Sequence, residues 1–389
     1  MATSLAKNLP LSGIRVLEFA GLAPAPFAGM ILADFGANVF RVDRAGETST
    51  LDSLSRGKRS ISLNLKSKKG VDVIRRLSSN TDILLEPYRP GVMEKFGLGP
   101  EALCGVNERL VYTRLNGFGS KGSHSNRAGH DINFLAMSGV LSMLGRKGMN
   151  PFPPINLLGD FAGGSMVAVL GILLALFERT LSGKGQVVEA SITEGAAYVS
   201  SFLQRSQDIG IWFGDRGENV LDSGAPFYET YETKDGRYMA VGAIETKFYQ
   251  QFVKGLEMDD ILADQFNLEQ WPSMKQLIAK RFKTKTQAEW VAIFENVDAC
   301  VTPVLTLDEA HIHQHNVENK TYMKNLKGGF EPCPAPMLSR TPGISKHRRD
   351  PCMGEHTVEI LTEEGFSATE IDDLLAGSHA EQYIPKSSL

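Results

Sequence analysis

The sequence contains few cysteines, and none of them forms a metal-binding or redox motif. Its 389 residues include four cysteines, at positions 104, 300, 333 and 352, with no CxxC spacing. This argues against a zinc site and against a disulfide framework. We therefore expect four reduced thiols in a reducing compartment.

The sequence also lacks an excess of charge of either sign. The 41 basic and 45 acidic residues give a net charge of −4, which does not favour a nucleic-acid-binding protein. Charged residues make up 22% and hydrophobic residues 42%, so wholesale disorder is excluded. The length predicts about two or three domains of roughly 100–200 residues each.

No segment has the pattern of a signal peptide or a membrane span. The N-terminal MATSLAKNLPLSG has no apolar core of the kind that signal peptides carry. The longest apolar stretch, residues 161–177, has 17 residues without a charge, fewer than the roughly 20 needed to cross a bilayer. We predict that this stretch is a buried core helix of a soluble protein with no membrane partner.

The N-terminal half has the pattern of an α/β sheet. Residues 13–19 read as a strand, residues 25–36 as a helix that stops at Gly36, and residues 38–42 as a second strand. A β-α-β unit of this kind implies a parallel pair with a right-handed crossover. Further strands are predicted at residues 82–85, 110–115 and 187–191.

The dinucleotide-binding fingerprint is missing from this α/β pattern. The turn after the first strand, residues 21–26, has one glycine where GxGxxG needs three. The sequence therefore argues against NAD or FAD, and we expect no cofactor.

The second half predicts a smaller α+β domain. Residues 227–233 and 237–241 flank Lys234-Asp235-Gly236, which is a strong hairpin signal. Thr286 with Glu289, and Ser367 with Glu370, are capping boxes that should each open a helix. Residues 328–342 read as an extended linker. We predict a large domain from residues 1–200 and 330–389, a linker at 201–221 and a small domain at 222–325.

Three polar residues stand out as candidates for chemistry, each with a structural alternative. His130 follows a glycine-rich polar loop and precedes an apolar helix, so it could face a ligand or cap the helix. Asp160 opens the longest apolar stretch. It could be an acid/base group, or it could be the N-cap of a helix. Glu245 ends a strand of small apolar residues and could be a solvated strand end. His311, His313 and His315 alternate in a metal-compatible way, but a solvated connection is the better interpretation.

Several motifs resemble those of the family III CoA-transferases. They are residues 10–18, 33–39, 88–92 and 129–133 and the pair Gly159-Asp160, and the resemblance runs over about residues 10–380. Within that family the chain looks most like the racemase branch. Transferase members typically have a flexible glycine-rich loop where this chain has residues 244–246.

The resemblance implies an interlocked homodimer of Rossmann-like large domains and smaller domains, with an active site shared between chains. It assigns proton transfer to His130 and Asp160, and support of the histidine to the partner's copy of Glu245. It also implies CoA- or substrate-binding roles for a larger set of residues: Arg44, Leu63, Asn64, Leu65, Lys66, Pro87, Tyr88, Arg89, Lys95, Gly129, Asp131, Ile132, Asn133 and Phe134. Some relatives have arginine at position 95, so lysine keeps the charge there but loses bidentate geometry.

The expected reaction is inversion of the methyl-bearing carbon 2 of a 2-methylacyl-CoA thioester. One group removes the proton from one face of that carbon, and the other returns a proton to the opposite face of the enolate. Backbone N–H groups near Asp160 are expected to stabilise the enolate oxygen. Two alternatives are a CoA-transferase with Asp160 as nucleophile and a non-catalytic acyl-CoA binder.

The C-terminus gives a weak indication of location. Lys386-Ser387-Ser388-Leu389 loosely resembles the peroxisomal signal S-K-L, with Ser in place of the central Lys. An enzyme of branched-chain lipid metabolism would fit a peroxisome or a mitochondrion, and the cytoplasm is the expectation otherwise.

Overall fold

The computed structural model describes residues 9–47, 51–260, 264–344 and 349–385, so the extreme N-terminus and the C-terminal tetrapeptide discussed above lie outside them. The chain divides into two compact units. The first comprises Met1–Ser138, Ile155–Val199 and Lys320–Leu389, and the second comprises Gly139–Pro154 and Ser200–Asn319. Residues 139–154, which the sequence analysis assigned to the large domain, thus group with the second unit.

The first unit is built on a seven-stranded sheet in the order β12-β3-β2-β1-β4-β5-β6. All neighbouring strands are parallel except β12, which runs antiparallel to β3. The bounds are β1 Arg15–Phe19, β2 Asn38–Arg44, β3 Arg59–Leu63, β4 Ile83–Glu86, β5 Val111–Asn116, β6 Val187–Ser191 and β12 Ala380–Glu381. The five strands predicted in this region are confirmed, whereas β3 and β12 were not predicted.

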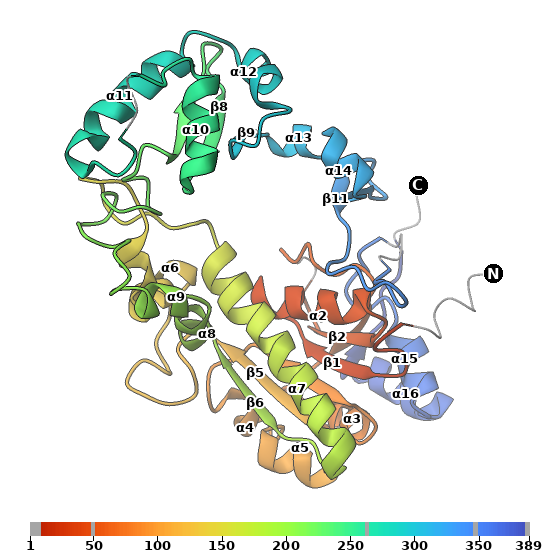
Figure 1. Ribbon diagram of the computed structural model, residues 1–389. Helices are drawn as coiled ribbons and strands as arrows, with labels where there is room; N and C mark the ends of the chain where they lie inside the picture. Colours follow the sequence, from red (N-terminus) through yellow and green to blue (C-terminus); the bar gives the residue numbers. More distant parts are fainter. Residues whose placement is uncertain (1–8, 48–50, 261–263, 345–348, 386–389) are drawn as a thin grey trace. The chain divides into compact units, whose positions relative to one another are not determined.

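Helices cover both faces of this sheet (Figure 1). Side chains alternate along each strand, so Val16 packs on one face and Leu17 on the other. The face of Val16 is covered by α2 (Pro24–Asp34) and α7 (Val167–Ser182). The opposite face is covered by α3 (Lys68–Ser78), α5 (Pro100–Val106), α15 (Thr357–Glu363) and α16 (Ala368–Ala376). Two shorter helices, α6 (Asp131–Ser138) and α8 (Ile192–Val199), complete the part of this unit that matters below.

The second unit has an antiparallel sheet of β7 (Tyr228–Glu232), β8 (Tyr238–Gly242) and β9 (Val301–Pro303). Three helices share a core with it: α10 (Thr246–Gly255), α11 (Trp271–Phe282) and α12 (Gln287–Phe294). The predicted hairpin is β7-β8, and the Thr286–Glu289 capping box opens α12 as expected. The second capping box, Ser367 with Glu370, opens α16 in the first unit.

Three local features of the sequence can be compared with the structure: the histidine cluster, the linker and the cysteines. The histidines at 311, 313 and 315 do not lie on an extended segment, because α13 (Leu307–Ala310) and α14 (Gln314–Glu318) form there. Within the described ranges no group of histidine, cysteine, aspartate and glutamate could hold a metal ion.

The linker predicted at residues 328–342 contains β11 (Phe330–Pro332), paired with β10 (Tyr322–Lys324). All four cysteines are free.

The prediction of a buried core helix at residues 161–177 holds for only one side of the helix. The apolar segment is a π-helix, η3 (Leu157–Met166), that continues directly into α7. One side of α7 is in the core, with Ala168 and Ile172 fully buried. The other side is exposed, and Leu174, Phe177 and Leu181 are 60%, 69% and 79% accessible. By length and composition Leu157–Ser182 could also cross a membrane, but its inner side is a core-packing face.

The π-helix η3 packs against α8 through backbone atoms. A Cβ added at Gly195 would lie 1.8 Å from the carbonyl oxygen of Gly163, and one added at Gly163 would lie 2.5 Å from the backbone nitrogen of Ala196. Only glycine permits this approach, since the neighbours are backbone atoms that cannot rotate away. The position of η3 is therefore fixed by two glycines.

We predict that Gly195→Ala destabilises the protein by about 3 kcal/mol, because overpacking against backbone forces the two elements apart. The measurement is the thermal unfolding midpoint of the first unit. Gly105→Ala is the matched control, since Gly105 lies in α5 with nothing within 4 Å of an added Cβ. The control should leave the midpoint unchanged or raise it. Equal midpoints for both variants would contradict the packing argument.

Candidate functional site

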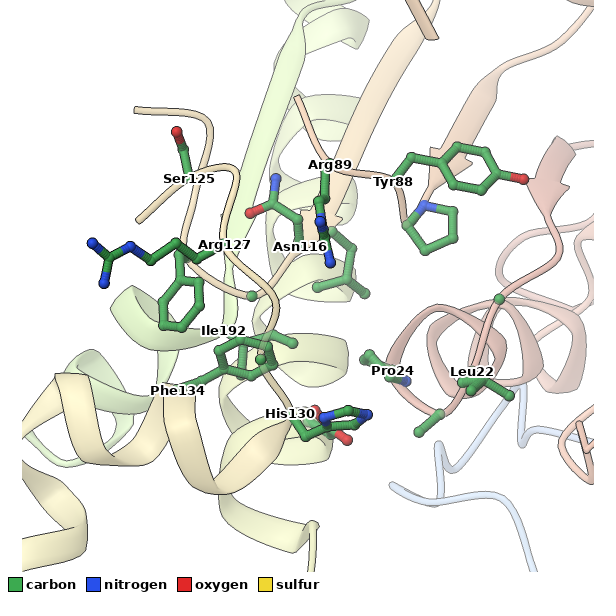
Figure 2. Close-up of a pocket in the computed structure, with 18 of the residues that line it drawn as sticks. Leu22, Pro24, Tyr88, Arg89, Asn116, Ser125, Arg127, His130, Phe134 and Ile192 are labelled. Carbon is green, nitrogen blue, oxygen red and sulfur yellow. The ribbon is translucent and has the colours of Figure 1, made fainter. Parts of the chain in front are cut away.

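A cavity of about 350 Å³ lies where the strand order of the sheet reverses. The chain runs from β1 to β2 and β3 on one side and then returns to β4 on the other side of β1. Parallel sheets bind ligands at the carboxyl ends of the strands at such a point. The cavity is lined by the turn after β1 (residues 20–24), the turn after β4 (residues 87–89) and the segment after β5 (residues 116–118). Figure 2 shows Leu22 and Pro24 facing it from the first of these turns.

Two glycines allow close contacts around the cavity, one between two turns and one between a turn and helix α6. A Cβ at Gly21 would lie 2.7 Å from Cγ of Pro87, so the turns after β1 and β4 meet only if this residue has no side chain. A Cβ at Gly117 would lie 2.0 Å from the ring of Phe134. Gly21, the single glycine in its turn, therefore serves contact between turns, which agrees with the missing dinucleotide fingerprint.

His130 enters the cavity from the junction between a loop and helix α6 (Figure 2). Its backbone N–H donates to Oδ1 of Asn133 at 3.0 Å, and its carbonyl accepts from the N–H groups of Asn133 and Phe134. Asn133 thus closes the start of the helix, which leaves the imidazole exposed at the cavity. His130 thus occupies the N-cap position through its backbone, and the side-chain hydrogen bond that closes this helix start comes from Asn133.

Asp160 lines the same cavity from the first turn of η3. The sequence left open that Asp160 is the N-cap of this helix. In the structure the N-cap of η3 is Asn156. Burial and then the negative charge of Asp131 raise the pKa of Asp160 to about 6, against a hydrogen bond from Asn156 and the attraction of His130. A carboxyl group with this pKa can exchange a proton near neutral pH.

The cavity therefore holds an imidazole and a carboxyl group, delivered by two different helices. The raised pKa of Asp160 lets its carboxyl group exchange a proton near neutral pH, and imidazole is the side chain that enzymes use most often for proton transfer. Two such groups are what is needed to remove a proton from one side of a carbon and return one to the other. The ring of Phe134, packed edge-on to Phe118 at 4.9 Å between centroids, gives an apolar wall beside them.

The other residues expected at the site fall into three groups. Pro87, Tyr88, Arg89, Gly129 and Phe134 line the cavity. A second group lies along the same carboxyl edge of the sheet without lining the cavity: Arg44 ends β2, and Leu63 ends β3 and is followed by Asn64, Leu65 and Lys66. The third group lies on helices and does not line the cavity. Lys95 is an exposed residue of α4 (Val92–Lys95). On α6, Ile132 and Asn133 are exposed, whereas Asp131 is buried.

Glu245 belongs to the second unit and lies outside the lining of this cavity. It is the exposed N-cap of α10, just after β8. Within the first unit, then, the structure brings together His130 and Asp160.

The backbone donors expected to stabilise an oxyanion are already engaged. The N–H of Asp160 donates to Oδ1 of Asp131 at 2.7 Å, and the N–H of Gly159 also bonds to that carboxylate. These groups therefore cannot serve a ligand, which corrects the expectation for the start of this helix.

Sequence reasoning missed several lining residues. They are Ala20, Gly21, Leu22, Ala23, Pro24, Leu115, Asn116, Gly117, Phe118, Ser125, Arg127 and Ile192. Most of them follow β1 or β5, so the rule that ligands bind at the carboxyl ends of strands beside the reversal could have found them. Arg127, like Arg89, is a cationic residue of the cavity lining.

Comparisons with known proteins agree with this arrangement. The model of the CoA-transferase family III matches residues 11–357. The chain is 54% identical to the alpha-methylacyl-CoA racemase of Mus musculus over 380 residues, covering 97% of this chain and 98% of that protein. It is 53% identical to the alpha-methylacyl-CoA racemase of Homo sapiens over 382 residues, covering 98% and 100%.

Among solved structures, a CAIB/BAIF family protein from Brucella suis has the same fold. Its TM-score is 0.80 at 22% identity, covering 92% of this chain and 100% of that one. Together with a reversal-point cavity that carries an imidazole and a carboxyl group, the extent of these matches shows that the chain belongs to the CoA-transferase family III.

Proposed function

We propose that this protein is a racemase or epimerase that inverts carbon 2 of 2-methylacyl-CoA thioesters. The observation that carries the proposal is that His130 and Asp160 line one cavity, with the pKa of Asp160 raised to about 6. The 53–54% identity to two alpha-methylacyl-CoA racemases over nearly the full chain supports the same activity.

The two groups act as base and acid in turn. Neutral His130 removes the proton from carbon 2 on one face, and the electron pair of the broken C–H bond moves into the thioester as an enolate. Protonated Asp160 then gives its proton to carbon 2 on the other face, and the carbonyl re-forms. For the other enantiomer the roles reverse, so both protonation states of Asp160 must be accessible at the working pH, as its pKa allows.

We assign stabilisation of the enolate oxygen to the N-terminal end of α6. This helix begins at Asp131, one residue after His130, so its first N–H groups and its partial positive charge lie beside the imidazole. The N–H groups at residues 159 and 160 are bound to Asp131 and are excluded from this role.

Cations along the carboxyl edge of the sheet are suited to the phosphates of CoA. Arg44 and Lys66 are exposed at the ends of β2 and β3, and Arg89 lies in the cavity wall. Charge-assisted hydrogen bonds from such residues bind phosphate without any glycine-rich loop.

Arg89→Ala and Lys66→Ala should each weaken binding of a CoA thioester by about 1–3 kcal/mol and make binding less sensitive to salt. Titration calorimetry at two ionic strengths measures both effects. Lys184→Ala is the matched control, since Lys184 is exposed but precedes β6 and so lies at the amino edge of the sheet. Affinities equal to wild type in both test variants would remove these residues from the site.

A CoA-transferase is the second candidate, because the same family contains it and Asp160 could be its nucleophile. A transferase forms an aspartyl thioester and leaves carbon 2 untouched. A racemase breaks the bond at carbon 2 and needs no acceptor acid. A non-catalytic acyl-CoA binder would do neither.

In D₂O, either enantiomer of a 2-methylacyl-CoA should gain one deuterium at carbon 2 while it racemises, with no second acid present. The rate should follow a bell-shaped pH profile, because one group must be protonated and the other not. Mass spectrometry of the recovered acyl group measures the deuterium gained, and chiral analysis measures the racemisation. Asp160→Asn and His130→Ala should abolish inversion. An adduct at Asp160 that hydroxylamine traps, without deuterium at carbon 2, would establish the transferase instead.

The proposal includes a homodimer in which Glu245 of one chain supports His130 of the other. The exposed side of α7 supports association, since a stripe of large apolar side chains at helical spacing is typical of a face that another surface covers. It comprises Leu170, Leu173, Leu174, Phe177 and Leu181. In the assembly, Glu245 would orient the imidazole and stabilise its charged form.

Mixed dimers test this sharing of the site. A His130→Ala chain refolded with a Glu245→Ala chain should recover about a quarter of wild-type activity, since half the dimers are mixed and each mixed dimer has one intact site. His130→Ala mixed with Asp160→Ala is the matched control. Both residues line the cavity of one unit, so every site in that mixture keeps a defect. Recovery in neither mixture, or in both, would contradict the shared site.

A further inference from the structure

The carboxylate of Asp131 faces the backbone that carries Asp160. Asp131 is the first residue of α6 and is 6% exposed. Its Oδ1 accepts the N–H of Asp160 at 2.7 Å and also bonds to the N–H of Gly159. A Cβ at Gly159 would lie 2.2 Å from this oxygen, so glycine is required for the contact. The side chain holds the peptide at residues 159–160 rather than lining the cavity.

The second oxygen of this carboxylate is unusual. Oδ2 of Asp131 is buried, and it has no hydrogen-bond partner among the residues that the structure describes. No lysine or arginine in the described ranges forms an ion pair with Asp131. A buried carboxylate without a cation is costly, so its charge is felt strongly by its neighbours.

Arg89 and Arg127 line the same cavity as Asp160, and few other charges act on it from the elements packed around it. His130, next to Asp131, attracts it, whereas α8 carries only the exposed groups Glu194 and Tyr198. Arg114 of β5 and Glu189 of β6 lie on the opposite face of the sheet from Leu115, which contacts η3. The remaining charged residues are at the distant ends of α2 and α7: Asp34, Glu178 and Arg179.

We propose that Asp131 is a positioning residue for Asp160: it fixes the backbone of Asp160 through two N–H groups, and its buried negative charge opposes ionisation of the neighbouring Asp160 carboxyl group. This inference rests on the proposed function, in which Asp160 must be able to donate a proton.

The ionisation order of the two carboxyl groups follows from their hydrogen bonds. Asp131 accepts two backbone N–H bonds, which favour its charged form, although burial raises its pKa. The anion of Asp160 is opposed by burial and by the charge of Asp131, and it is stabilised by one hydrogen bond from Asn156 and by the attraction of His130. Asp131 therefore ionises first, and the proton that remains on the pair is on Asp160.

Asp131→Asn removes the charge and keeps an acceptor for the N–H of Asp160. Activity is lost in acid when both catalytic groups are protonated. Because the pKa of Asp160 falls in the variant, the acid limb of the racemisation pH profile should move by about one unit to lower pH. The plateau should stay within about threefold of wild type. Asp131→Ala, which also removes the acceptor, should lower the plateau by about tenfold or more.

Asp34→Asn is the matched control, because Asp34 is a buried aspartate of the same unit that does not face Asp160. It should leave the acid limb in place. If Asp131→Asn does not fold, Asp131→Ser supplies a neutral side chain with an acceptor, and its limb should move in the same direction. An acid limb at the wild-type position in whichever neutral variant folds would overturn the proposal.

A second readout separates this inference from the proposed function. The carboxyl ¹³C signal of Asp160, identified by its loss in Asp160→Asn, reports the titration without any turnover. Its midpoint should fall in Asp131→Asn. If wild type lacks racemase activity but the midpoint still falls, the proposed function fails and the coupling stands. If wild type racemises and the midpoint does not move, the inference about Asp131 fails.

Discussion

The site depends on one close contact, the packing of η3 against α8 through Gly163 and Gly195. Because backbone meets backbone, the π-helix cannot slide along its neighbour, and the first turn that carries Asp160 is held at a fixed place. The π-helical winding itself belongs to a class of irregularity that is frequent at functional sites. Asp131 then connects this turn to α6, and His130 lies one residue before that helix. The two groups to which we assign proton transfer are therefore linked through rigid elements.

The sheet supplies the second half of the site through its topology. The reversal between β1 and β4 opens a cavity at the carboxyl edge, and Gly21 lets the two turns close against each other. Along the same edge the ends of β2 and β3 present cations to solvent. The proposed function would therefore place the reacting carbon of the thioester at the reversal and its phosphates along the edge.

Local signals in the sequence predicted much of this fold, and tertiary effects account for the rest. The first β-α-β unit, the hairpin and both capping boxes depend on neighbouring residues, so they could be found. Strand β3 was missed because RSISL mixes polar and apolar residues, although four of the five are buried in the structure. The exposed side of α7 could not be foreseen, since an apolar side chain does not show what covers it. His130 and Asp160 were candidates, but their meeting in one cavity depends on contacts between distant segments.

The tuning of Asp160 also bears on which chemistry within the family the cavity favours. A nucleophilic carboxylate works best fully ionised, so burial and an adjacent negative charge are the wrong environment for it. A group that must alternately give and take a proton needs both forms to be populated. With a pKa of about 6, both forms of Asp160 are populated near neutral pH. A buried, unpaired carboxylate at Asp131 costs stability, and this cost is understandable if it serves the proton balance of its neighbour. The same feature that would hinder a transferase therefore suits a racemase.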